Sequence, residues 1–368
     1  MKNQAITVIS LAFILAAGAL GFVENVEATD YRFTIEHQGI ERFYLIHVPD
    51  SYNENNPTPV VLAFHGGAGN AESFTKYYNF IEESDQEGFI VVFPNGACRP
   101  IHCPNIATWN AGTCCSYAVD SNSDDVGFVK KMMKKLEDDF NIDENRIYAT
   151  GHSNGGMFSY RLACEMSNEF AAIAANAGTE NILSCNPSRA IPVFHIHALN
   201  DGHVYFNGGC SDCSVNSGLD YTSVNETIER WVLRNNCNPT PERVLEIVGS
   251  DGVYCDEYTG CSNGVRVKIC ATQDGGHSWP GGQKTSIFSD TPTQVISATH
   301  EMWEFFEKHP MPQAGDVNGD GSVNILDVQA CVNHLLGAQD WGAAADVNRD
   351  GTVNVLDVQE IVNIILGG

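Results

Sequence analysis

The segment Gly151-His152-Ser153-Asn154-Gly155 constrains the fold of this chain more than any other. It follows an apolar strand candidate at residues 146–150 and opens a helix candidate at residues 154–166. A serine between small residues at a junction of strand and helix is typical of a strained turn that exposes its hydroxyl at the edge of a sheet. The N–H groups at the start of such a helix stabilise negative charge there. An ordinary glycine-rich loop is the alternative, but the flanking strand and helix favour a nucleophile at Ser153.

Strand and helix candidates alternate along residues 31–309. The strand candidates are short apolar runs that stop at turn residues, as expected of strands buried on both faces. Asp124 and Asp125 precede an apolar stripe at helical spacing, which indicates a helix with an acidic cap. This alternation predicts the α/β class, with a mainly parallel sheet covered by helices on both faces. The strand candidates are residues 59–64, 88–93, 146–150, 170–175, 191–197 and 265–271.

A serine nucleophile needs a histidine base and a carboxylate that orients the base. In strand–turn–helix hydrolases the chain order is serine, acid, histidine. Asp201 follows the strand candidate at residues 191–197, and His277 follows the one at residues 265–271. Both therefore lie at the carboxyl ends of predicted parallel strands, where open α/β sheets bind their ligands. We predict Ser153, Asp201 and His277 as the catalytic residues.

Two other histidines, His197 and His203, compete with His277 for the role of base. Neither follows the predicted acid by the interval that a further strand requires, and we therefore favour His277. Asp201 also has an alternative interpretation, because Asn200-Asp201-Gly202 is a common turn sequence.

A glycine-rich segment, His65-Gly66-Gly67-Ala68-Gly69, comes directly after the strand candidate at residues 59–64. Loops in this position supply backbone N–H groups that bind the oxyanion of an acyl-transfer intermediate, beside the N–H of the residue after the nucleophile. We therefore predict an oxyanion hole built from the backbone of Gly67, Ala68 and Asn154. A glycine-rich turn without such a role is the alternative.

Several separated motifs resemble one family of esterases. They are Gly-His-Ser-Asn-Gly-Gly around Ser153, Gly-Gly-His-Ser-Trp-Pro-Gly around His277, Trp-Asn-Ala-Gly-Thr-Cys-Cys from Trp109, and Asp-Asp-Val-Gly-Phe from Asp124. Together they resemble the family that groups polyhydroxybutyrate depolymerases with feruloyl and acetylxylan esterases, the family 1 carbohydrate esterases. The resemblance covers roughly residues 31–309. One departure is His195-Ile-His-Ala-Leu-Asn-Asp201, where members more often carry Gly-Thr or Gly-Ser before the acid.

The resemblance implies an α/β-hydrolase fold and hydrolysis of a carboxylic ester through an acyl-enzyme. It places Trp109 near the mouth of the site, where an indole can stack on an aromatic or sugar ring, and we expect Trp109 and Trp279 to bind substrate. The expected substrate is a feruloyl or acetyl ester of a plant cell-wall polysaccharide. A polyhydroxyalkanoate depolymerase acting on a polyester is the alternative, and a non-catalytic, calcium-dependent scaffold is an alternative of another class.

Beyond residue 315 the chain repeats itself, because the twelve residues from Asp316 to Asp327 return thirty residues later from Asp346 to Asp357. Oxygen-bearing side chains stand at positions 1, 3, 5, 9 and 12 of each repeat, with glycine at position 6, as in EF-hand calcium loops. An acidic, solvated tail is the alternative. The predicted calcium ligands are Asp316, Asn318, Asp320, Ser322, Asn324 and Asp327 in the first loop and Asp346, Asn348, Asp350, Thr352, Asn354 and Asp357 in the second.

Paired loops of this kind, each followed by an apolar helix, resemble type I dockerins, small all-α modules that bind cohesins. The resemblance implies a cohesin-like protein partner. Positions 10 and 11 of the loops are Ile325-Leu326 and Val355-Leu356, where cellulosomal dockerins often carry a polar recognition pair.

The N-terminus has the pattern of a secretory signal peptide. Lys2 precedes an uncharged apolar run, and Val26-Glu27-Ala28 fits the small residues of a cleavage site. We expect a secreted protein with a signal peptide at residues 1–28, an esterase domain at 29–309, a linker at 310–315 and a dockerin-like domain at 316–368. A retained membrane anchor is the alternative, because the run approaches the length of a spanning helix.

The chain has 13 cysteines, which agrees with export to an oxidising compartment. Twelve lie between Cys98 and Cys270, and Cys331 is left over. Three pairs are close enough in sequence to close small loops, and we expect the vicinal Cys114 and Cys115 to join separate disulfides. The three close pairs are Cys98 with Cys103, Cys210 with Cys213, and Cys255 with Cys261. Zinc at Cys210 and Cys213 is disfavoured, because no second ligand pair follows at finger spacing.

The formal net charge is −26. Nucleic acids and anionic membrane surfaces are bound by basic patches, so this charge argues against both as partners once the signal peptide is removed.

Overall fold

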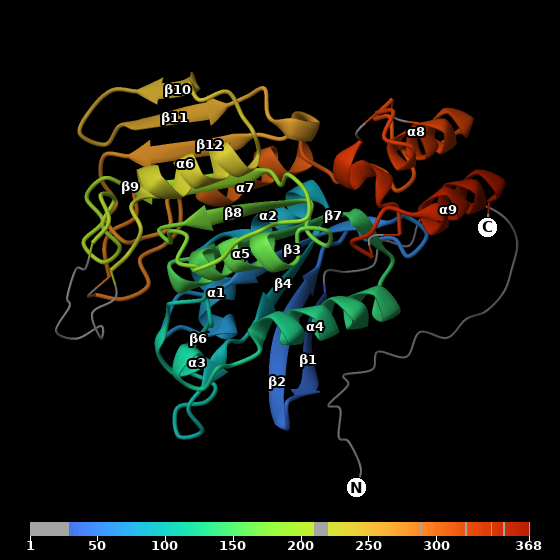
Figure 1. Ribbon diagram of the computed structural model, residues 1–368. Helices are drawn as coiled ribbons and strands as arrows, with labels where there is room; N and C mark the ends of the chain where they lie inside the picture. Colours follow the sequence, from blue (N-terminus) through green and yellow to red (C-terminus); the bar gives the residue numbers. More distant parts are fainter. Residues whose placement is uncertain are drawn as a thin grey trace, which may run out of the picture.

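A ten-stranded sheet forms the centre of this computed structural model, which describes residues 29–209, 220–287, 289–320, 322–339, 341–348 and 350–367 (Figure 1). Six neighbouring strands are parallel, and antiparallel strands extend the sheet at both edges. In spatial order the strands are β1 (Thr29–His37), β2 (Ile40–Val48), β4 (Ile90–Pro94), β3 (Thr58–Phe64), β7 (Ile142–His152), β8 (Ala172–Asn176), β9 (Val193–Ala198), β12 (Val267–Thr272), β11 (Val253–Tyr258) and β10 (Glu242–Ile247).

The predicted α/β class is confirmed, and each of the six strand candidates corresponds to one of the six parallel strands. The remaining elements are helices and a short hairpin. They are α1 (Ala71–Tyr77), α2 (Phe80–Glu87), β5 (Ala97–Cys98), β6 (Ala107–Thr108), α3 (Ser116–Asp120), α4 (Asp125–Asp139), α5 (Asn154–Glu165), α6 (Val224–Arg234), η1 (Ser262–Gly264), α7 (Ala298–Glu307), α8 (Ile325–Leu335), η2 (Gly342–Ala345) and α9 (Val355–Leu366).

Helices cover both faces of the sheet, and each face has its own apolar core. Helices α4, α5 and α6 contribute to one core, while α1, α2 and α7 contribute to the other (Figure 1). Strand β3 contributes side chains to both cores, because Val60 and Leu62 lie in the first core and Val61 lies in the second. Successive side chains of a strand point to opposite faces. An uninterrupted apolar run is therefore the sequence signature of such a strand.

The C-terminal helices α8 and α9 pack around a small core of their own, which contains Val317, Cys331 and Ile361. Cys331 is a free, buried cysteine, as its position outside the cysteine-rich region predicted. No helix of the described ranges is long and apolar enough to cross a membrane. The predicted signal peptide at residues 1–28 lies outside the described residues.

The disulfides correct two of the sequence-based expectations. The pairing of Cys98 with Cys103 is confirmed. Cys255 instead bonds Cys270, which lies directly opposite in the antiparallel register of β11 and β12. Cys261 bonds Cys237, so the expected pairing of Cys255 with Cys261 is wrong.

The expectation that Cys114 and Cys115 join separate disulfides is also wrong, because the two are bonded to each other. Cys164 bonds Cys185. The expected pair of Cys210 and Cys213 lies outside the described residues.

A buried ion pair joins the edge strand β2 to the start of helix α4. Arg42 Nη1 lies 2.9 Å from Asp125 Oδ1, and the Asp125 side chain is fully buried. Asp125 Oδ2 also accepts the backbone N–H of Asn110 at 2.8 Å, and Arg42 donates to the carbonyl of Asn95. These bonds satisfy both charged groups inside the protein and join four separate segments.

Asp125→Ala should lower the free energy of unfolding by about 3–5 kcal/mol, because it leaves the Arg42 guanidinium buried without its counter-ion. The matched control is Glu72→Ala, which breaks the exposed pair of Arg32 and Glu72 and should cost no more than about 1 kcal/mol. Urea unfolding of both variants measures the difference. Equal losses would contradict the role assigned to the buried pair.

Candidate active site

Ser153 lies in a strained turn between β7 and α5. Its backbone has φ 54° and ψ −121°, in the left-handed region that residues with side chains rarely adopt. A Cβ at position 155 would lie 2.6 Å from the carbonyl oxygen of His65 and would overlap that of Phe64. A Cβ at position 151 would overlap the backbone of residue 155. The two glycines of the motif are therefore required for the helix to approach β3 this closely.

The three predicted catalytic side chains meet at the carboxyl edge of the sheet. His277 Nε2 lies 2.8 Å from Ser153 Oγ, and His277 Nδ1 lies 2.8 Å from Asp201 Oδ2. Asp201 follows β9 and His277 follows β12, as the strand candidates predicted. The geometry is that of a serine, a base and an orienting acid.

Asp201 is held as a buried carboxylate. Its Oδ1 accepts the backbone N–H groups of His203 and Val204 at 2.8 and 2.9 Å. Burial alone would raise the pKa of Asp201, but hydrogen bonds from His197 and His277 outweigh it and hold the pKa well below its usual value. An ionised Asp201 accepts the Nδ1–H of His277, which leaves the Nε2 lone pair of His277 facing the Ser153 hydroxyl.

The two alternative histidines have different surroundings. The exposed His203 ring lies against the His277 ring, with a centroid distance of 5.0 Å. His197 is buried and lies 3.3 Å from Asp201 Oδ2. Within the described residues, neither side chain hydrogen-bonds Ser153, so the geometry favours His277 as the base.

The glycine-rich loop after β3 packs against the turn at Ser153 between β7 and α5. A Cβ on Gly67 would lie 3.6 Å from the Cβ of Asn154, and Ala68 has a positive φ of 61°. Asn154 is the first residue of α5, whose initial N–H groups have no acceptor within the helix. Throughout the described part of the chain, the backbone N–H groups of Gly67, Ala68 and Asn154 have no protein acceptor.

The two predicted substrate-binding tryptophans require a correction. Trp109 is 0% exposed, stacks on Phe158 and donates its indole N–H to the carbonyl of His65. Trp279 is 1% exposed and donates to Thr299 Oγ1. Neither ring presents a face to the surface, so the expectation that they stack on substrate is wrong.

Trp109 instead belongs to a buried hydrogen-bond network behind the glycine-rich loop at residues 65–69. The sequence analysis did not predict this network. The Asn154 side chain accepts from the Trp109 backbone N–H at 2.7 Å and donates to the Trp109 carbonyl at 3.0 Å. His65 Nδ1 donates to the carbonyl of Gly66, and His65 Nε2 accepts from the backbone of Gly96. Burial lowers the pKa of His65 to about 4, so the ring stays neutral in this network.

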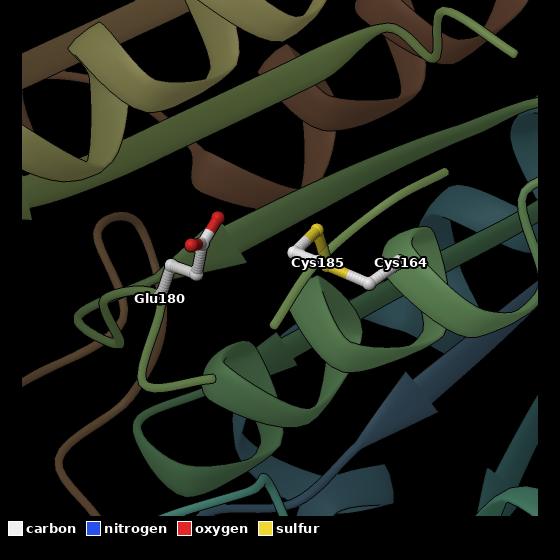
Figure 2. Close-up of side chains that lie close together, drawn as sticks. All are labelled: Cys164, Glu180 and Cys185. Atoms are coloured by element: carbon white, nitrogen blue, oxygen red, sulfur yellow. A yellow bond between two sulfur atoms is a disulfide. The ribbon is translucent and has the colours of Figure 1, made fainter. Parts of the chain in front are cut away.

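Figure 2 shows one cluster of potential metal ligands, made of Cys164, Glu180 and Cys185. The two sulfur atoms are joined in a disulfide, and sulfur binds metals as a thiolate. Glu180 is buried and paired with Arg230 and Arg234. The cluster therefore has a structural role.

The two C-terminal loops contain chemistry that suits calcium. Asp327 and Asp357, at the twelfth positions, are fully buried and, among the described residues, accept only backbone N–H groups, such as that of Asn324 at 2.9 Å. In the described ranges, neither carboxylate pairs with a Lys or Arg side chain. A buried carboxylate without a counter-ion is costly, and a hard cation with oxygen ligands satisfies it. The residues present therefore fit calcium.

Two family models match separate parts of the chain. Residues 38–217 match a family described as putative esterase, and residues 314–366 match the dockerin type I domain, which supports calcium binding by the repeats. Feruloyl esterase B from Piromyces equi is 26% identical over 247 residues, which span 66% of this chain and 44% of that enzyme. A solved acetyl xylan esterase from Aspergillus awamori has 15% identity and a TM-score of 0.49, covering 76% of this chain and 99% of that one.

A probable feruloyl esterase C from Aspergillus niger is 30% identical over 278 residues. The alignment covers 73% of this chain and 85% of that enzyme. The chain therefore belongs to the esterase family that includes the feruloyl esterases C.

Proposed function

We propose that this protein is a secreted serine esterase that cleaves feruloyl or acetyl esters of plant cell-wall polysaccharides through an acyl-enzyme. The observation that carries the proposal is the position of His277 between Ser153 Oγ and Asp201 Oδ2, at 2.8 Å from each. The acyl groups are suggested by the names of the relatives, which include feruloyl esterases and a bifunctional acetylxylan esterase.

In the proposed mechanism, Ser153 Oγ attacks the ester carbonyl while His277 Nε2 takes the hydroxyl proton. The resulting oxyanion accepts hydrogen bonds from the backbone N–H groups of Asn154, Gly67 and Ala68, which have no competing acceptor among the described residues. His277 then gives its proton to the departing sugar hydroxyl, and the acyl group remains on Ser153. Water, deprotonated by His277, hydrolyses this acyl-enzyme. Asp201 stays ionised and stabilises the imidazolium in both steps.

We propose that the C-terminal repeats form a separate calcium-dependent module from residue 316, after a linker at residues 310–315. Each loop would hold one calcium ion through the side-chain and backbone oxygens of the six residues predicted for that loop. The ion would neutralise the buried carboxylates and fix the loops, without a part in ester hydrolysis. A cohesin-like protein is the proposed partner, and the exposed apolar pairs Ile325-Leu326 and Val355-Leu356 are the proposed contacts.

Ser153→Ala and His277→Ala should each lower kcat for p-nitrophenyl acetate by about 10⁴-fold or more, because the members of a triad act as a unit. Asp201→Asn should also be severe, since it removes the charge that orients His277. Ser121→Ala, an exposed serine on another segment, is the matched control and should keep normal activity. Near-normal activity in Ser153→Ala would overturn the proposed function.

A substrate panel should separate the acyl groups and polymers. We expect release of ferulate from methyl ferulate or of acetate from acetylated xylan, with no clearing of a polyhydroxybutyrate suspension. Ser153→Ala, assayed in parallel, identifies background hydrolysis. Clearing of the suspension without release of either acid would assign the enzyme to polyester degradation instead.

Chelation should loosen the C-terminal module and leave the esterase active. In the full chain, we expect isothermal titration to find about two calcium sites and EDTA to lower the melting temperature of one calorimetric transition. Asp327→Ala combined with Asp357→Ala should abolish both effects, whereas Glu360→Gln, outside the loops, should not. Absence of calcium binding in the unaltered chain would refute the proposed ligand set.

A further inference from the structure

A row of buried polar side chains leads from helix α5 to Asp201. Tyr160 Oη lies 2.8 Å from His195 Nδ1, and His195 Nε2 lies 3.1 Å from His197 Nδ1. His197 Nε2 then lies 2.7 Å from the carbonyl of Val204 and 3.3 Å from Asp201 Oδ2. All of these side chains are buried, and two of them belong to the His195-Ile-His197 segment that departs from the family pattern.

The carbonyl of Val204 fixes the direction of every hydrogen bond in this row. A carbonyl oxygen only accepts, so His197 carries its proton on Nε2 and has a lone pair on Nδ1. His195 must therefore donate from Nε2 to that lone pair, and its own Nδ1 accepts from the Tyr160 hydroxyl. The reverse direction would require a cationic His197 and would leave the Tyr160 proton without an acceptor in the described residues.

Burial keeps two members of the row, His195 and Tyr160, neutral. Burial lowers the pKa of His195 well below its ordinary value and raises that of Tyr160 well above its own. The other titratable groups nearby are His152 and His203 beside His277, and Glu180 and Arg234 near Tyr160. In the described part of the chain, none of these four side chains hydrogen-bonds a member of the row.

We infer that His197 is a positioning residue for the catalytic acid, and that His195 and Tyr160 hold it in the one tautomer that can donate to Asp201. This inference rests on the proposed function, because it assigns Asp201 to the triad. Asp201 Oδ2 accepts from His277, and the His197 Nε2–H, which donates to Val204, lies against the same oxygen at 3.3 Å. Oδ1 accepts two backbone N–H groups. Four N–H groups therefore surround the carboxylate and fix its plane. The opposite tautomer of His197 would turn a lone pair toward Asp201 and repel it.

Removal of the donor should change turnover and its pH dependence. In His197→Leu we expect kcat to fall by about tenfold to hundredfold with little change in KM, since a hydrogen bond to a charged group is lost. The acid limb of the kcat/KM profile should move to higher pH, because a less neutralised Asp201 holds protonated His277 more strongly. His197→Gln, whose amide can donate from nearly the same position, should restore part of the activity.

The far end of the row gives a second, milder test. Tyr160→Phe removes one hydroxyl and should lower kcat by about threefold to tenfold, since a neutral hydrogen bond is lost. Tyr148→Phe is the matched control, because the Tyr148 hydroxyl is buried and has no hydrogen-bond partner in the part of the chain that the structure describes. It should leave kcat and the pH profile unchanged.

Nitrogen NMR of the ¹⁵N-histidine-labelled enzyme tests the tautomers without an activity assay. We expect both His195 and His197 to carry a proton on Nε2 and a lone pair on Nδ1, as their hydrogen bonds require. A proton on Nδ1 of either ring, or a cationic His197, would overturn the inference even if His197→Leu does not fold. Unchanged kcat and pH profiles in folded His197→Leu and Tyr160→Phe would overturn it as well. Activity in Ser153→Ala would instead refute the proposed function.

Discussion

The close approach of helix α5 to strand β3 is the constraint on which the site depends. It brings the backbone of Gly155 against the carbonyl oxygens of Phe64 and His65, where no side chain fits. The same approach holds Ser153 at a positive φ and places the start of α5 beside the loop that follows β3. One packing contact between two elements therefore positions both the proposed nucleophile and the proposed oxyanion donors.

Neutral hydrogen-bond networks stabilise this contact on both sides of the turn at Ser153. On one side, the Asn154 side-chain amide forms two hydrogen bonds with the backbone of Trp109, and the Trp109 indole donates to the carbonyl of His65. On the other side, Asn176 donates to His152 and to the carbonyl of Ser278, next to His277. Such groups cost little to bury once they are satisfied, and their hydrogen bonds hold the backbone around Ser153 and His277 in place.

The sequence predicted the strand ends well, and it predicted the distant contacts less well. Uninterrupted apolar runs identify the six parallel strands, and the order of residues after those strands leads to Ser153, Asp201 and His277. The burial of Trp109 depends on Phe158 and His65, and the bonding of Cys255 to Cys270 depends on the register of β11 and β12. These are contacts between segments whose spacing along the chain carries no signal. The prediction that Cys114 and Cys115 join separate disulfides was wrong for a related reason, because spacing alone does not determine disulfide connectivity.

The buried carboxylates of this chain have two different kinds of surroundings. Asp201 is surrounded by two histidines and two backbone N–H groups, so its charge is stabilised by protein donors alone. Asp327 and Asp357 have backbone donors but no basic side chain among their described neighbours, and further oxygen-bearing side chains stand in the same loops. The first arrangement is complete without an ion, whereas the second is completed by a cation. With both arrangements in one chain, the proposed catalytic site would stay independent of calcium while the C-terminal module would respond to it.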